Sequence, residues 1–128
     1  MTTDATRPRQ RSSGEGWSLE ADEAPELSVY RLRGEFDFAV SPKLADLFPA
    51  DPGARRVVVD MTEVRFCDSS CLQALLRLAG RLAEAGGRFA IASTVPAVVR
   101  PIELLGLGAV LPVHPSVDAA RASWGEET

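Results

Sequence analysis

The feature that most constrains the fold is a strand–helix–strand pattern over residues 55–93. The segment "RRVVVDM" at 55–61 is a β-branched run bounded by charges, typical of a strand that is buried on both faces of a sheet. "RFAIAS" at 88–93 predicts a second strand. Between them lies an apolar stripe at helical spacing that ends at Gly86-Gly87 and consists of Leu72, Leu75, Leu76, Ala79, Leu82 and Ala83. Since a helix between two strands is typical of a crossover connection, we expect a largely parallel sheet with helices packed on it.

The N-terminal part of the chain predicts two more strands and a short helix. The strands are expected at 17–21 and 27–34, where apolar and polar residues partly alternate. Ser41 followed by Pro42 is typical of a helix N-cap and the first helical residue. Pro49 is expected to end this helix after about two turns.

The C-terminal third predicts two helices separated by a short strand. Residues 94–108 favour a helix, but Pro101 could fall in its interior and cost about 3 kcal/mol there. We therefore expect the helix to begin late, near Val98, or to kink. A last strand is expected at 109–113, and a last helix capped by Ser116 follows it.

The length of 128 residues suits one domain with a single core. Residues 1–16 are polar and rich in Gly, Ser and Arg, so we expect a flexible N-terminal tail. The folded domain is expected at 17–124, followed by a short tail at 125–128. The fold class is α/β, a mixed and mostly parallel sheet of four to five strands with about four helices.

Charge and hydropathy argue against several classes of partner. The net charge is −4, and the only basic cluster lies in the N-terminal segment at Arg7, Arg9 and Arg11, so nucleic acid is not an expected partner. No apolar run reaches the roughly 18 residues that a membrane span needs, and the N-terminus has no apolar stretch of signal-peptide type. We therefore expect a cytoplasmic protein that does not bind membranes.

The sequence offers little for catalysis, metal binding or redox chemistry. His114 is the single histidine, and no G-x-S-x-G motif accompanies Ser69 or Ser70. Cys67, Cys71 and His114 supply at most three of the four ligands of a structural zinc site. The C-x3-C spacing is not a C-x-x-C redox pair, so the two thiols are best interpreted as small hydrophobes. We expect no enzymatic activity, no metal and no cofactor.

What remains is "CDSSC" at 67–71, where the long helix begins. Asp68 is expected to cap the helix by accepting backbone N–H bonds. Capping does not account for the two hydroxyls that follow, Ser69 and Ser70. A phosphate on a serine of the first turn would meet the positive end of the helix dipole and add about −1.5 to −2 charges. If this charge cost a partner about 4 kcal/mol, the affinity would fall roughly a thousandfold.

Around these residues the chain resembles a known family. Residues 57–120, which contain "VVVDMTEVRFCDSSCLQALL", and residues 31–44, "RLRGEFDFAVSPKL", are similar to the STAS-domain proteins and specifically to the bacterial anti-sigma-factor antagonists. "GEFD" corresponds to the family's Gly-Glu-Leu-Asp segment. The resemblance extends over about 17–124 and is carried best by D-S-S at the start of a Leu-rich helix.

The resemblance implies a regulator that is not an enzyme. The unphosphorylated domain would bind an anti-sigma factor, often itself a serine kinase, and so release the sigma factor. The kinase would phosphorylate Ser69, and a metal-dependent serine phosphatase would reverse the reaction. Ser70 would occupy the second hydroxyl position, and Asp37 would lie near the acceptor.

The resemblance also places the partner surface. It implies that the partner contacts the exposed face of the helix that follows the acceptor, at Gln73 and Arg77. Cys71 stands where the family usually has glycine, so its side chain is expected to affect how closely a partner approaches.

Two alternatives remain open from the sequence. The chain could be an unphosphorylated STAS subunit of a transport or lipid-trafficking assembly, or a scaffold domain, with the same helix as a permanent docking surface. Alternatively, oxidation of Cys67 and Cys71 could reshape the helix end and modulate the same switch, although no basic neighbours in the sequence favour a reactive thiolate.

Overall fold

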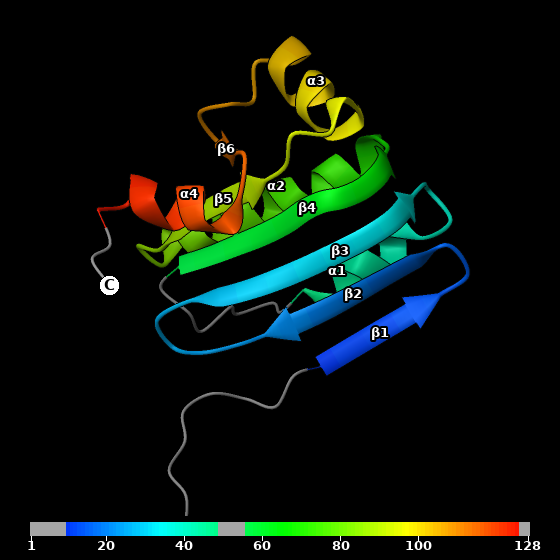
Figure 1. Cartoon of the computed structure of the whole chain (residues 1–128), viewed down its shortest axis with the longest axis horizontal. Coiled ribbons are helices and arrows are strands. Elements are labelled where there is room, and N and C mark those ends of the chain that lie inside the picture. Colours follow the sequence, from blue (N-terminus) through cyan, green and yellow to red (C-terminus); the bar gives the residue numbers. More distant parts are fainter. Residues whose placement is uncertain (1–9, 49–55, 126–128) are drawn as a thin grey trace, which may run out of the picture.

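The computed structural model describes residues 10–48 and 56–125 of the chain. Over these residues it contains six strands and four helices (Figure 1). In chain order they are β1 (Gln10–Gly14), β2 (Trp17–Asp22), β3 (Ser28–Phe36), α1 (Ser41–Leu47), β4 (Arg56–Cys67), α2 (Ser69–Glu84), β5 (Arg88–Ala92), α3 (Pro96–Leu104), β6 (Val113–His114) and α4 (Val117–Ser123).

The strands form one mixed sheet in the order β1-β2-β3-β4-β5-β6. The first three strands are antiparallel neighbours, whereas β3, β4, β5 and β6 run parallel to one another. The predicted α/β architecture with a mostly parallel sheet is therefore confirmed. The described part of the chain has one strand more than the four to five expected.

The additional strand, β1, corrects the predicted flexible tail over 1–16. It pairs with β2 from Gln10↔Ala21 to Gly14↔Trp17, across a tight turn in which Gly16 adopts a positive φ of 82°. A polar segment can form this strand because the backbone of β2 supplies its hydrogen bonds and an edge strand needs no continuous buried face. Residues 1–9 and 126–128 of the predicted tails lie outside the described residues.

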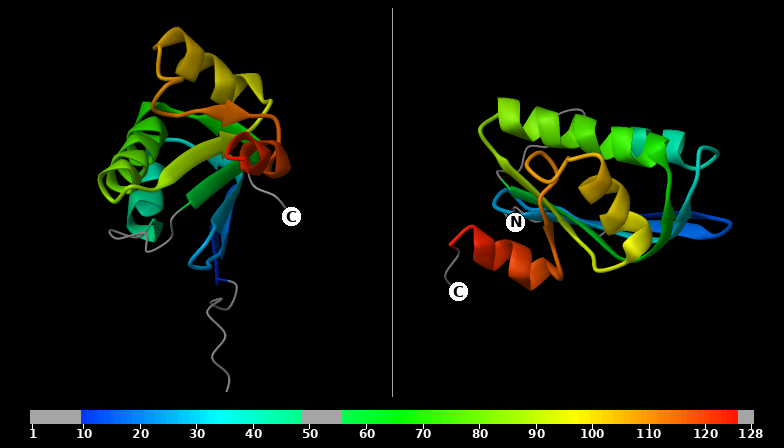
Figure 2. Two further views of the ribbon diagram at one scale, coloured as in Figure 1. Left: turned by 90° about the vertical axis from the view of Figure 1, so that its left-hand side faces the viewer. Right: turned by 90° about the horizontal axis from the view of Figure 1, so that it is seen from above.

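The central strand β4 is buried on both faces, as its β-branched run predicts. Val57 and Val59 belong to the larger core, which also includes buried side chains of α1 and α2. Val58 points the other way and packs in a smaller cluster with Ala120 of α4. Figure 2 shows this division: α1 and α2 lie on one side of the sheet and α4 lies on the other.

Helix α2 begins and ends where the sequence predicts. Gly86 follows the helix with a positive φ of 78°. The Gly87 N–H donates to the Leu82 carbonyl at 2.7 Å, which is typical of a helix C-terminus. The buried face is rotated from the predicted stripe, because Ala83 is exposed while Leu78 is fully buried. The side of α2 that is buried depends on α1 and the sheet, which pack against it. The spacing of apolar residues within one helix does not specify those neighbours.

The starts of two helices differ from the prediction. The N-cap of α1 is Val40 rather than Ser41, which is the first helical residue. Helix α3 begins at Pro96 rather than near Val98, and Pro101 lies inside it. Pro101 has no backbone N–H, so this short helix lacks one hydrogen bond, the one to the carbonyl four residues earlier.

The C-terminal elements are partly as predicted. The last strand is two residues long, Val113–His114, and so overlaps the expected strand at 109–113 only at Val113. The predicted cap of the last helix is confirmed, since Ser116 Oγ accepts the Ala119 N–H at 3.0 Å. Among the helices formed by residues 10–48 and 56–125, none is long and apolar enough to cross a membrane.

Candidate functional site

Two parallel strands bring the acidic residues of the candidate site together. In the register of β3 and β4, Phe36 is opposite Cys67, the last residue of β4. The Asp68 N–H then donates to the Phe36 carbonyl at 3.2 Å. Because both strands end at the same edge of the sheet, Asp37 and Asp68 follow at neighbouring positions there. The fold thus brings together two motifs that are about 30 residues apart in the sequence.

The Asp68 carboxylate organises the start of α2. Its Oδ1 accepts the Cys71 N–H at 3.0 Å, which confirms the predicted helix cap. The same oxygen accepts the Ser70 hydroxyl at 2.7 Å and the buried Ser41 hydroxyl at 3.4 Å. One carboxylate oxygen therefore joins the first turn of α2 to the first residue of α1.

The serine hydroxyls differ in how they are held. Ser70 is half-buried and donates to Asp68, and Ser41 is buried and also contacts the Phe36 carbonyl at 3.4 Å. Ser69 is exposed at the first position of α2, and no hydrogen bond joins its hydroxyl to any residue that the structure describes. A phosphoryl group on Ser69 would leave the hydrogen bonds of the cap intact, whereas one on Ser70 would replace the hydroxyl that donates to Asp68.

Asp37 shapes the turn between β3 and α1. Its Oδ1 accepts the N–H groups of Ala39 and Val40 at 3.0 and 3.2 Å. These bonds hold the turn that precedes α1, whose N-cap, Val40, makes no side-chain cap, and the Ser41 hydroxyl bonds to Asp68. The turn leaves the Phe38 side chain 78% exposed.

Exposed aromatic rings at this edge were missed from the sequence. Phe38 follows Asp37 directly, and Phe66, at the end of β4, is 47% exposed. Phe66 pairs in register with Glu35 of β3. The only sequence signal was an aromatic residue directly after the "GEFD" segment, where a loop was expected.

The predicted partner-binding residues share one face of α2. Ser69, Gln73 and Arg77 are all exposed and follow one another at four-residue spacing. Residues four apart lie on the same side of a helix, so these three form one exposed row that begins at the candidate acceptor. We call them the α2 row.

The cysteines do not belong to that surface. Cys71 is fully buried and Cys67 is nearly so, and neither forms a disulfide. The side chain of Cys71, predicted to take part in partner binding, therefore lies in the core and not in the exposed α2 row. A hydrogen bond with the Cys67 thiol, together with burial and nearby negative charge, raises the pKa of Cys71 far above its ordinary value.

The ligand types for a metal site are dispersed. Within residues 10–48 and 56–125, no group of three or more His, Cys, Asp or Glu side chains is placed to hold a metal ion. His114 lies in β6. Strand β5 separates β6 from β4, so His114 is apart from Asp68 and the serines that bond to it.

The chain is similar to one protein family and to several solved structures. The family model of the STAS domain matches residues 18–120. No curated protein sequence matches the chain. An anti-sigma factor antagonist from Mycobacterium paratuberculosis has 27% identity and a TM-score of 0.76, over 90% of this chain and 99% of that one.

More distant structures share the fold. Unphosphorylated SpoIIAA, an anti-sigma factor antagonist, has 19% identity and a TM-score of 0.71 over 86% of this chain and 99% of that one. The phosphorylated form of SpoIIAA from Bacillus has a TM-score of 0.63, with 18% identity over 83% and 98% of the two chains. A sulfate transporter family protein from Wolinella succinogenes has 18% identity and a TM-score of 0.60 over 76% and 83%.

Proposed function

Because this chain belongs to the STAS domain family, we propose that it is an anti-sigma-factor antagonist that is switched by phosphorylation of Ser69. The unphosphorylated form binds an anti-sigma factor and thereby releases the sigma factor. The observation that carries the proposal is the exposed hydroxyl of Ser69 at the start of α2, beside a cap that Asp68 and Ser70 complete without it. Likeness to anti-sigma factor antagonists of solved structure supports this function.

Phosphorylation would act through charge on a preserved surface. The phosphate would lie at the positive end of the α2 dipole, so the helix would remain folded. It would add about −1.5 to −2 charges at the first position of the α2 row, beside the carboxylate of Asp68. A partner that fits a neutral hydroxyl there would meet a strongly hydrated anion instead, and its affinity would fall.

The proposed cycle assigns the chemistry to other proteins. The anti-sigma factor is the serine kinase, which transfers the phosphoryl group from ATP to Ser69 Oγ as the hydroxyl loses its proton. A serine phosphatase hydrolyses the phosphoserine and restores the binding form. In this cycle the chain is a substrate and a binding partner, not an enzyme, and it works in the cytoplasm, where transcription takes place.

The assignment of the acceptor is tested by incubating the protein with its cognate anti-sigma kinase and ATP and mapping the product by mass spectrometry. We expect a single phosphate on Ser69. Ser69→Ala should abolish labelling, while Ser70→Ala, the matched change one residue along, should remain a substrate. Labelling of Ser69→Ala at the wild-type rate would refute the assignment.

The second candidate function is that of a STAS subunit or scaffold domain that is never phosphorylated. The likeness to a sulfate transporter family protein is the observation that favours it. In that case the α2 row would bind a transporter or scaffold permanently. Genes for an anti-sigma kinase or phosphatase beside this one would favour the switch, and permease or transporter ATPase genes would favour the subunit.

A further inference from the structure

A second cluster of functional side chains lies at the opposite end of the central strands from Asp68. Arg56 is the first residue of β4 and Arg88 is the first residue of β5, and the two are direct partners in the parallel register. Paired residues of neighbouring strands point to the same face, so the two arginines start from the same side of the sheet. Like charges directly opposite each other destabilise a sheet unless something offsets the repulsion.

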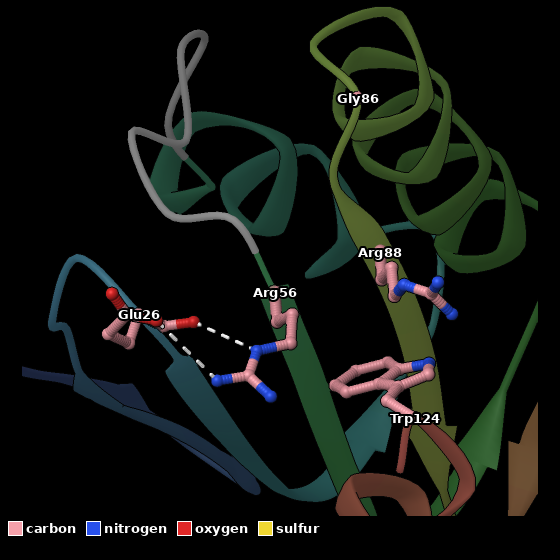
Figure 3. Close-up of a pocket in the computed structure, with 5 residues that line it drawn as sticks. All are labelled: Glu26, Arg56, Gly86, Arg88 and Trp124. Carbon is pink, nitrogen blue, oxygen red and sulfur yellow. Dashed lines mark hydrogen bonds and ion pairs between the residues drawn. The ribbon is translucent and has the colours of Figure 1, made fainter. Parts of the chain in front are cut away.

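The third member of this cluster is Trp124, the C-cap residue that directly follows α4. Its side chain is half-buried and packs against the smaller core cluster, which contains Val58 and Ala90. Since side chains two apart on a strand share a face, Arg56 and Arg88 lie on that same face. Glu26, Arg56, Gly86, Arg88 and Trp124 line a pocket of about 250 Å³ at this place (Figure 3).

The two guanidinium groups are held differently. Arg56 Nε donates to the Glu26 carbonyl at 3.2 Å, and its side chain is only 20% exposed, so the group is well positioned. The carboxylate of Glu26 is 3.7 Å from Arg56 Nη2 and is 80% exposed, and such a surface pair contributes little. Arg88 is exposed, and no ion pair or hydrogen bond joins its guanidinium to any of the described residues.

We propose that Arg56, Arg88 and Trp124 form a binding site for a small organic anion, a phosphate ester or carboxylate that carries a flat ring. Guanidinium groups recognise phosphate and carboxylate oxygens through paired N–H donors, and an indole offers an apolar face or edge to a ring. The pocket is smaller than the roughly 300–1,000 Å³ typical of drug-sized ligands, so a one-ring ligand is the expected size.

The site is tested by NMR titration of the full chain with phenyl phosphate, benzoate and inorganic phosphate as separate probes. The chain has two tryptophans, whose indole N–H signals serve as reporter and internal control. Trp17 packs against Phe36, with ring centroids 6.1 Å apart, away from this pocket. Saturable movement of the Trp124 signal with phenyl phosphate or benzoate, and none at Trp17, supports the site.

A matched pair of variants tests the residues. Arg88→Gln should weaken binding by about tenfold or more, as expected for losing a charged hydrogen-bonding group. Arg65→Gln makes the same charge change on an exposed residue near the other end of β4 and should bind like wild type. Unfolding curves of both variants show that they fold.

Two results would overturn the inference, and a third would remove the role assigned to Trp124. The first is a Trp124 indole N–H signal that does not move with any probe up to about 10 mM. At that concentration a site with a Kd of about 1 mM would be mostly occupied. The second is unchanged binding by Arg88→Gln. If inorganic phosphate and phenyl phosphate bound with equal affinity, the contact between Trp124 and the ring of the ligand would be disproved.

Discussion

At the scale of single residues, the candidate site depends on one oxygen atom. Asp68 Oδ1 accepts hydrogen bonds from a backbone N–H and two serine hydroxyls, and one of these hydroxyls is buried. This arrangement holds Ser70 and leaves Ser69 exposed. The difference between adjacent serines thus arises from geometry and not from residue type.

Replacing Asp68 with alanine should lower the free energy of unfolding by about 1–3 kcal/mol. The change removes the cap of α2 and takes an acceptor from the buried Ser41 hydroxyl. Urea unfolding measures the loss. Asp46→Ala, which removes an exposed carboxylate from α1, is the control and should change stability by less than about 0.5 kcal/mol. Equal stability of both variants would show that the Asp68 contacts do not contribute.

The buried thiol of Cys71 makes a prediction about pH. Its pKa is raised in the folded state by the hydrogen bond with Cys67 and by burial. The unfolded chain therefore loses this proton first, and the contribution to stability that is present at neutral pH is lost as pH rises above about 8.5. Urea unfolding of wild type and Cys71→Ala across this range should show a steeper decline for wild type. If stability fell equally with pH in wild type and Cys71→Ala, the prediction would be contradicted.

At the scale of elements, glycine allows β3 to approach the β1–β2 turn. Gly34 has a positive φ of 99°, and a Cβ at this position would lie 2.1 Å from the Gly16 carbonyl oxygen. Gly16 also accepts the Glu35 N–H at 2.9 Å, so the two backbones are held together just before Asp37. The first residue of the "GEFD" segment is therefore fixed by close packing of the backbone.

Gly34→Ala should destabilise the protein by more than about 2 kcal/mol, because both the φ value and the contact with Gly16 oppose a side chain. Gly80→Ala is the matched change within α2, where an added Cβ meets no atom within 4 Å. This variant should be more stable by about 0.5–1 kcal/mol. Thermal unfolding compares the two. A Gly34→Ala protein as stable as wild type would contradict the geometry.

The elements also show what sequence reasoning can and cannot reach. Helix α2 and its Asp68 cap were predictable because periodicity and capping depend on neighbouring residues. Strand β1 was missed because its hydrogen bonds come from β2 and not from its own composition. Ser41 was assigned a local cap, whereas its hydroxyl reaches Asp68, 27 residues away, across two elements. The exposure of Phe38 likewise depends on a turn that Asp37 holds.

At the scale of the whole molecule, the parallel strands separate two regions. Their carboxyl ends carry Asp37, Asp68 and the α2 row, and their amino ends carry the paired arginines and Trp124. The central strand β4 connects both regions through a core that is buried on each face. The proposed switch therefore presents a preformed surface, and phosphorylation changes its charge with little change of fold.

The most direct test of this account is a calorimetric titration of the anti-sigma factor with unphosphorylated protein and with protein phosphorylated at Ser69. We expect tight binding of the first and at least about a hundredfold weaker binding of the second, a difference of about 2.7 kcal/mol. Amide NMR spectra should show that the phosphorylated domain remains folded. Equal affinity of the two forms, with Ser69 fully phosphorylated, would contradict the switch.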